Sequence, residues 1–206
     1  METTFNRAIR ISSLVLGFAS LTLAAGVQAQ TSTTARSDSG YSLFSPGTSY
    51  IGLNAGQANF KLNNGLGGFP AEQRRNSYSL YGGSYLNNLG AEIGYTNFGR
   101  VTRAGGSTKA EGFNLGVVGK LPVTQALNVI GRIGTTYGRT NVSAAPASGI
   151  VSGKQNGFGL SYGVGAEYVF LPNVSAVLQY DEYNLKFANT GRERINSASL
   201  GLRYRF

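Results

Sequence analysis

The sequence repeats one simple unit along most of its length: a run of about ten residues that alternate in polarity, followed by a turn. The stretch 157–170 shows the pattern clearly, since Phe158, Leu160 and Tyr162 alternate with Gly159 and Ser161. A period of two residues is typical of a β-strand with one apolar side and one polar side. Eight such strands are predicted, at 49–60, 76–85, 89–98, 110–121, 127–139, 157–170, 174–183 and 195–206. No apolar stripe of helical period runs through this region, so the predicted fold is all-β.

The connections between these strands alternate in length. Short turns are predicted at 86–88, 122–126 and 171–173. Longer connections, rich in Gly, Asn, Ser and Ala, are predicted at 61–75, 99–109, 140–156 and 184–194. Alternating short turns and long loops are typical of outer-membrane barrels. A β-sandwich has a similar number of strands, but its connections need not sort by length in this way.

The polar face of the strands separates these two folds. In a sandwich that face meets water and carries many long charged side chains, whereas here it is mostly Gly, Ser and Asn, and only 13% of all residues are charged. Small residues with a few charges suit the crowded interior of a small barrel, and strands of this length cross a bilayer when tilted. We therefore expect an eight-stranded antiparallel up-and-down transmembrane β-barrel over residues 49–206. Because Gly82 and Gly83 interrupt the alternation, the pattern does not orient Tyr78, Tyr81 and Tyr85.

The first residues have the pattern of an export signal. Arg7 and Arg10 precede an apolar stretch of 15 residues, and a small-residue cleavage site follows before Gln30. Residues 1–29 are therefore predicted to be a signal peptide, and the polar segment 30–48 a flexible periplasmic leader to the first strand. The chain has no cysteine, which excludes a lipid anchor at the cleavage site, disulfides and thiolate metal sites.

The charge of the chain suggests its surroundings. The formal net charge is +9, and it is +8 without Glu2, Arg7 and Arg10 of the signal peptide. An exported basic protein meets little nucleic acid, so anionic lipid or lipopolysaccharide is the expected partner. The predicted lipopolysaccharide-facing residues in the outer loops are Arg74, Arg75, Arg100, Arg103, Lys109, Arg192 and Arg194. Simple solubility of the loops explains the same charges equally well.

Catalytic and cofactor chemistry find no support in the sequence. There is no histidine to act as the base of a barrel lipase, acyl transferase or protease. The adjacent carboxylates Asp181 and Glu182 point to opposite sides of a strand. The glycines of 65–68 precede neither a helix nor a Lys-Ser/Thr pair, so they do not predict a phosphate site. We expect no enzyme activity, no cofactor and no metal.

Four segments resemble the OmpA-like transmembrane barrels of Gram-negative bacteria. "GAEIGYTNFGR" at 90–100 is similar to the third strand of that family, and "GKLPVT" at 119–124 to the fourth. "GRIGT" at 131–135 and "GAEYVFLPNVSAVLQY" at 165–180 are similar to the fifth strand and to the sixth and seventh. The resemblance covers roughly residues 49–206. It implies an eight-stranded barrel in the outer membrane. Many relatives also carry a peptidoglycan-binding domain after the barrel, and that function is not carried over to this chain.

The resemblance also implies a network of ion pairs inside the barrel. The strand pattern and the family together place Glu92, Lys120, Arg132 and Glu167 in the lumen, and the pattern adds Asp181 and Arg203. The family has an inward arginine on the seventh strand where this chain has Val177. Glu92 therefore needs Arg132, Arg203 or Lys120 as its partner. Two interpretations stay open: the charges only satisfy one another and stiffen the barrel, or they form a gate for small ions.

The last strand ends on an aromatic residue. Leu200, Leu202, Tyr204 and Phe206 share one face, and the resemblance implies that Tyr204 and Phe206 form the signal read by the barrel-assembly machinery. The sequence thus predicts a monomeric outer-membrane protein, with no nucleic-acid partner. Its expected role is structural or interactive, with basic loops contacting lipopolysaccharide or external partners. The alternative is a narrow porin-like channel for ions or small solutes.

Overall fold

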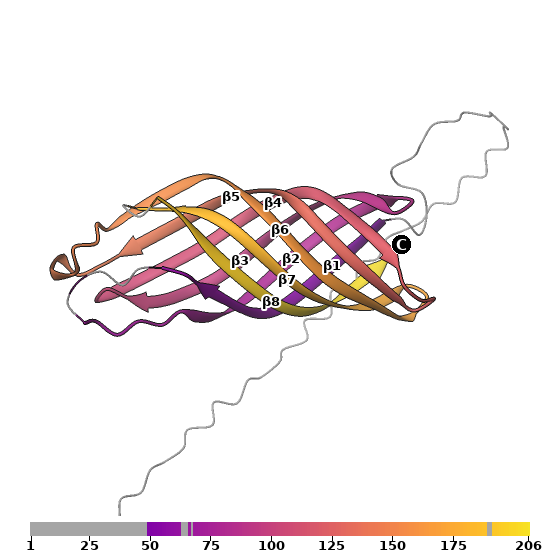
Figure 1. Ribbon diagram of the computed structural model, residues 1–206, viewed down its shortest axis with the longest axis horizontal. Helices are drawn as coiled ribbons and strands as arrows, with labels where there is room; N and C mark the ends of the chain where they lie inside the picture. The colour runs from indigo at the N-terminus through magenta and orange to yellow at the C-terminus, as the bar shows by residue number, and fades with distance from the viewer. Residues whose placement is uncertain (1–48, 63–65, 67, 189–190) are drawn as a thin grey trace, which may run out of the picture. The chain divides into compact units, whose positions relative to one another are not determined.

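The computed structural model describes residues 49–62, 66, 68–188 and 191–206, so the predicted signal peptide and leader lie outside the described residues. Eight antiparallel strands follow one another in chain order and form a closed barrel, because β1 also pairs with β8 (Figure 1). The predicted fold class is confirmed. The strands are β1 (Ser49–Phe60), β2 (Arg74–Leu86), β3 (Leu89–Arg103), β4 (Gly106–Pro122), β5 (Leu127–Ser143), β6 (Gly153–Leu171), β7 (Val174–Phe187) and β8 (Gly191–Arg205).

Most strands continue beyond the stretches that the sequence pattern predicted. The predicted long connections at 99–109 and 184–194 are wrong, because β3 and β4 pair as far as Arg103↔Gly106 and β7 and β8 as far as Phe187↔Gly191. The extensions lack a lipid-facing apolar side. Their outward positions carry polar residues such as the paired Arg100 and Lys109, so the alternation that reveals a membrane strand is lost there.

A two-residue turn joins β3 to β4. Ala104 and Gly105 both have positive φ, 53° and 69°, which matches the twist of a tight hairpin. An alanine in this region is uncommon, because its Cβ approaches the following carbonyl group. The main chain of Ala104 is held from outside the hairpin, since its carbonyl accepts a hydrogen bond from the Ala145 N–H at 2.8 Å.

The connections still differ between the two ends of the barrel. At one end lie short connections, 87–88, 123–126 and 172–173. At the other end lie the longer connections 61–73 and 144–152, which meet where the Leu66 N–H donates to the Ser148 carbonyl at 2.9 Å. Barrels of the outer membrane place short turns toward the periplasm, so the end with 61–73 and 144–152 is extracellular. No helix in the described part of the chain has the length and hydropathy to cross a membrane.

A band of exposed apolar side chains surrounds the barrel. Leu53, Leu115 and Leu200 are about 60% exposed, on β1, β4 and β8 respectively. Because large apolar groups rarely gather on a surface that meets water, this band faces lipid. Aromatic side chains follow at its extracellular border, where Tyr95 contacts Phe113 and Tyr137 contacts Phe158, with ring centroids 5.1 and 4.9 Å apart.

The structure also shows which side chains of β2 face the lumen, which the sequence pattern did not decide. On β2, Tyr81 and Tyr85 are buried in the lumen, whereas Tyr78 is 57% exposed on the lipid side. The ring of Tyr50 on the neighbouring β1 lies against both, with centroids 6.3 Å from Tyr81 and 5.2 Å from Tyr85. The phase of the alternation is thus continuous through Gly82 and Gly83.

Candidate functional site

The periplasmic half of the lumen holds a charge cluster around Glu167. This carboxylate is fully buried on β6, and its Oε1 lies 3.3 Å from Arg203 Nη1 and 2.7 Å from Arg205 Nη2. Ser175 Oγ donates to Oε1 at 2.7 Å, and Asn128 Nδ2 donates to Oε2 at 3.1 Å. Burying a carboxylate is unfavourable unless its charge and its lone pairs are matched, and here both conditions are met.

A second cluster lies further toward the middle of the barrel. Arg132 on β5 reaches two carboxylates: its Nη1 lies 2.5 Å from Glu92 Oε1, and its Nη2 lies 2.7 Å from Asp181 Oδ1. The hydroxyl of Tyr50 donates to the other oxygen of Glu92 at 2.8 Å. The lumen charges predicted from the sequence therefore come together, and Arg132 is the close partner of Glu92.

Arg203 stands between the two clusters. Its Nη2 lies 3.9 Å from Glu92 Oε2, and its guanidinium lies over the rings of Tyr50 and Tyr81, 4.2 and 5.5 Å from their centroids. Val177 is buried in the lumen as expected and leaves room on that side. Lys120 was considered as a partner of Glu92, but it forms a cation–π contact instead. Its Nζ stands over the Tyr85 ring, 4.8 Å from the centroid.

A small cavity with polar and apolar side chains in its lining borders the second cluster. Its volume of about 40 Å³ is enough for one or two water molecules. Asn114 extends from β4 into this region, donating to Thr96 Oγ1 at 2.9 Å and accepting from Thr136 Oγ1 at 2.7 Å. The cavity lining includes Glu92, Arg132, Asp181, Thr96, Asn114 and Tyr183. The cavity can hydrate the charges, but it is too small to pass a solute.

The extracellular half of the lumen has a different character. It is filled by a cluster of buried apolar side chains, the apolar plug, in which the rings of Phe98 and Tyr183 lie 4.8 Å apart. The plug consists of Ala58, Phe60, Phe98, Val101, Ala110, Val142, Tyr183, Leu185, Phe187, Ala188 and Ile195. The prediction of small residues and isolated charges on the whole inner face is therefore wrong for this half. The sequence contained the signal for this apolar half, because these residues occupy inward-facing positions in the alternation of their strands.

The β7–β8 hairpin supplies part of the plug by turning into the barrel. The β6–β7 ladder ends at Ser161↔Tyr183, and beyond it Thr140 Oγ1 on β5 donates to the Lys186 carbonyl on β7 at 2.6 Å. Leu185 packs against Gly138 of β5, where an added Cβ would lie 2.6 Å from Leu185 Cδ2. β7 thus crosses the inner face of β6, where an added Cβ at Gly159 would lie 1.5 Å from the main-chain carbonyl oxygen of Asn184.

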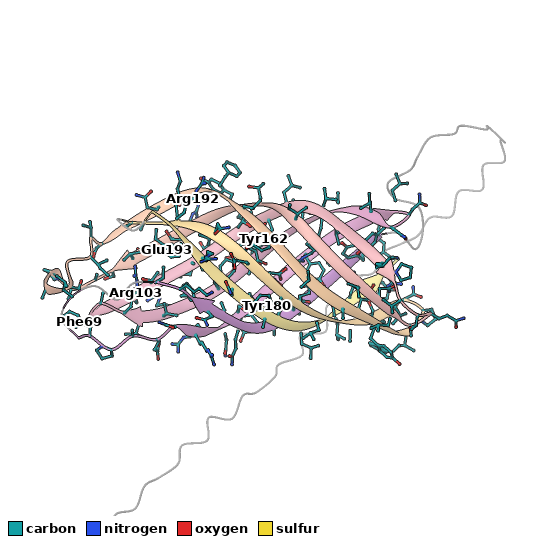
Figure 2. All side chains as sticks on the ribbon, in the orientation of Figure 1. Phe69, Arg103, Tyr162, Tyr180, Arg192 and Glu193 are labelled. Carbon is teal, nitrogen blue, oxygen red and sulfur yellow. The ribbon has the colours of Figure 1, made fainter. Side chains whose placement is uncertain are left out.

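Arg103 lies inside the barrel, which corrects its prediction as a lipopolysaccharide-facing residue. The side chain is 2% exposed, and its Nε donates to Thr108 Oγ1 at 2.8 Å. Glu193 of β8 interacts with it electrostatically. Figure 2 shows both residues, with Phe69, toward the extracellular end of the barrel, away from Tyr162 and Tyr180. Because β3 continues to Arg103, this residue shares the inward phase of the buried Val101, and its side chain lies inside the barrel.

The other predicted basic residues lie outside, just above the aromatic border. Together with further cations they form the outer belt on seven of the eight strands. Neighbouring members lie directly opposite one another on adjacent strands, as in the pairs Arg100↔Lys109 and Lys186↔Arg192. The outer belt consists of the exposed or half-exposed Arg74, Arg75, Arg100, Lys109, Arg139, Lys154, Lys186, Arg192 and Arg194. Loop solubility alone does not require such an arrangement, because these residues lie in strands rather than in loop tips.

Three carboxylates partly neutralise the positive charge of the outer belt. Lys109 Nζ lies 2.8 Å from Glu111, while the longer pairs Arg75–Glu72 and Arg194–Glu182 are both 3.7 Å. Three cations lie close together on β2 and β3, and of these only Arg75 has a carboxylate within 4 Å among the described residues. There Arg74, Arg75 and Arg100, with Gln57 and Asn76, line a surface depression of about 350 Å³.

Comparison with known proteins identifies the family. The OmpA-like transmembrane domain matches residues 45–206. The chain belongs to this family. Outer membrane protein P5 of Haemophilus influenzae is 35% identical over 157 residues, covering 65% of this chain and 43% of that protein. Outer membrane protein A of Shigella flexneri is 31% identical over 157 residues, covering 71% and 44%. The chain thus spans less than half the length of these relatives.

Solved structures with the same fold are also outer-membrane barrels. Neisserial surface protein A superposes with a TM-score of 0.59 at 17% identity, covering 77% of this chain and 97% of that one. Ail of Yersinia pestis gives a TM-score of 0.54 at 20% identity, covering 79% and 100%. The family, its curated outer-membrane relatives and the apolar band locate the barrel in the outer membrane of a Gram-negative bacterium.

The OmpA-like barrel presents its last residues as the resemblance implied. Tyr204 and Phe206 face outward and are 50% and 58% exposed, and the Phe206 N–H donates to the Ser49 carbonyl at 3.0 Å. Their predicted role as an insertion signal stays a prediction. In the part of the chain that the structure describes, no group of three or more Asp, Glu, His or Cys residues could hold a metal ion.

Proposed function

We propose that this OmpA-like barrel is a structural and interaction protein of the outer membrane, held in its leaflet by contacts between the outer belt and the phosphates of lipopolysaccharide. The observation that carries the proposal is the position of the outer belt, directly above the aromatic side chains that mark the membrane border. Guanidinium groups pair with phosphate through two parallel hydrogen bonds. A cation near an anionic membrane surface contributes about 1 kcal/mol.

Arg74 and Arg100 are the best residues for a test, because they line the same depression and have no carboxylate within 4 Å among the described residues. We expect the variant Arg74→Gln/Arg100→Gln to bind lipopolysaccharide roughly tenfold or more weakly, as loss of about 2 kcal/mol implies. Binding is measured by titrating lipopolysaccharide into the purified barrel in phospholipid nanodiscs.

Two controls separate a specific phosphate contact from general charge. Arg74→Lys/Arg100→Lys keeps the charge and should keep most of the affinity. Lys120→Gln removes one positive charge inside the barrel, where Nζ stands over Tyr85, and should leave binding unchanged. Equal binding by the Arg74→Gln/Arg100→Gln variant and the unmodified barrel would refute the proposal and leave loop solubility as the explanation.

The alternative of a narrow pore is less well supported. The lumen charges and the small cavity would hydrate an ion, but the apolar plug stands between them and the extracellular side. A catalytic role also lacks support, because the chain has no histidine and its lumen carboxylates are paired with arginines.

A further inference from the structure

The inward turn of β7 leaves one edge of β6 without a partner. β6 begins at Gly153, but its ladder with β7 begins only at Ser161↔Tyr183. On its other side β6 pairs with β5 along this whole stretch, from Gly153↔Val142 onward. Among the described residues, no strand pairs with β6 between Gly153 and Leu160 on the side away from β5. The wall of the barrel is therefore open along one strand edge at its extracellular end.

The hydrogen-bonding groups on this edge can be assigned residue by residue. Thr135 Oγ1 of β5 donates to the Gly159 carbonyl at 3.2 Å, and the Gln155 carbonyl oxygen lies 3.4 Å from Thr140 Oγ1 of β5, so odd-numbered residues face β5. In an antiparallel strand the N–H and C=O of one residue point to the same side, and successive residues alternate. The main-chain groups of Lys154, Asn156 and Phe158 therefore face the open edge.

A side chain rather than a strand contacts this edge. Arg192 Nη2 donates to the Phe158 carbonyl at 3.4 Å, a long contact that occupies one acceptor. The residues Lys154, Asn156 and Phe158 are all exposed. An unpaired strand edge of this kind is a template for pairing with another chain. Its cations keep it out of the hydrocarbon region, where free edges do not occur.

The charge around the edge indicates what kind of chain fits. Lys154 lies on the edge itself, Arg192 bridges to it, and the stem of Lys186 packs beside Gly157, where an added Cβ would lie 2.9 Å from Lys186 Cδ. All three side chains are exposed. Glu111 lines the same surface depression as Lys154 and Asn156, but Lys109 and Arg139 also line it, so cations outnumber the carboxylate there. The edge thus combines free main-chain groups with a local excess of positive charge.

From these observations we propose that the edge formed by Lys154, Asn156 and Phe158 binds an extended acidic segment of a partner protein, which adds to the barrel as a further strand. Main-chain hydrogen bonds supply the affinity, as in other cases of strand addition, and the cations select acidic side chains. Arg192 then leaves the Phe158 carbonyl and pairs with a carboxylate of the bound segment. The edge cations Lys154, Lys186 and Arg192 also belong to the outer belt, so the interaction is tested in the absence of lipopolysaccharide.

Amide hydrogen exchange measured by NMR on the mature protein in lipopolysaccharide-free phospholipid nanodiscs tests the proposal. The amides of Lys154, Asn156 and Phe158 should exchange fast, and those of Gln155 and Gly157 slowly, because only the second set is bonded to β5. The probe is a short synthetic peptide of alternating Glu and Val. Its addition should slow exchange of the three edge amides at least about tenfold. The same peptide N-methylated at alternate positions should have no effect.

A matched pair of variants tests the edge directly. Asn156→Pro removes the edge N–H without touching the ladder to β5, a position at which proline is tolerated, and should abolish the effect of the peptide. Asn156→Ala removes the side chain but keeps the N–H, and should retain it.

Three results would overturn the proposal. Slow exchange of the three amides without any peptide, rising with protein concentration, would mean that a second copy of the chain covers the edge. Protection by added lipopolysaccharide alone would make the occupant a lipid. If the acidic peptide does not slow exchange of the three edge amides, the proposed partner is refuted, whatever the outcome of the lipopolysaccharide titration.

Discussion

At the scale of single residues, Arg132 has the largest structural consequence. It pairs with both Glu92 and Asp181, so its removal leaves Asp181 without its cation and Glu92 with only the longer contact to Arg203. Removing one partner of a buried ion pair typically destabilises a protein by several kcal/mol, because the remaining charge is left uncompensated. The Tyr50 hydroxyl, which donates to Glu92, cannot replace a positive charge.

We therefore expect Arg132→Ala to lower the free energy of unfolding by about 3 kcal/mol. The measurement is urea-induced unfolding in phospholipid vesicles, followed by circular dichroism. Lys120→Met serves as the control, because it removes a cation that stands over an aromatic ring, and it should cost less than about 1 kcal/mol. Equal effects of the two substitutions would mean that the Arg132 pairs contribute little to stability.

Residue-level features also show what the sequence could reveal. The inward positions of Glu92, Arg132, Glu167 and Asp181 follow from the alternation of their strands, and the structure places all four in the lumen. The choice among three partners for Glu92 did not follow, because it depends on how the strands are staggered around the barrel. Arg103 was misplaced for a related reason, since a tight two-residue hairpin replaced the expected loop.

At the scale of elements, the β7–β8 hairpin decides the character of the extracellular half. It crosses the inner face of β6 at Gly159, where an added Cβ would lie only 1.5 Å from the carbonyl oxygen of Asn184. A side chain at this position cannot be accommodated by a rotamer change, because the obstacle is main chain. Substitution at Gly159 should therefore displace β7 and loosen the hairpin.

The variant Gly159→Val is expected to speed amide exchange of Leu185 and Phe187 at least about tenfold, as a local loss of 1–3 kcal/mol implies. NMR in nanodiscs measures this exchange directly. Gly131→Val is a suitable control, since Gly131 faces outward on β5 with no heavy atom within 4 Å of an added Cβ. Unchanged exchange in Gly159→Val would contradict the proposed crossing.

The path of this hairpin was not predictable from the alternation alone. Leu185, Phe187 and Ile195 keep the inward phase, which marks them as buried, but the phase does not say that β7 leaves the wall. That outcome depends on glycines of two other strands, Gly138 on β5 and Gly159 on β6, which provide the space. Contacts between strands distant in sequence are invisible to a pattern that is read one strand at a time.

At the scale of the whole barrel, the lumen is divided into two parts. The periplasmic half holds the ion pairs around Glu167 and Arg132 together with a smaller cluster of buried aromatic and aliphatic side chains, and the apolar plug fills the extracellular half. The interior of an eight-stranded barrel is narrow enough for side chains to fill it. An ion that entered from the periplasm would meet the apolar plug, in which an unpaired charge is strongly disfavoured.

The central claim is that the lumen does not conduct ions and that the barrel acts through its outer surface. Single-channel recording of the mature protein in planar lipid bilayers tests this claim most directly. The claim predicts no resolvable conductance steps from the unmodified protein. Reproducible steps that disappear when the protein is omitted would contradict it, and would make the channel alternative the better account of the lumen.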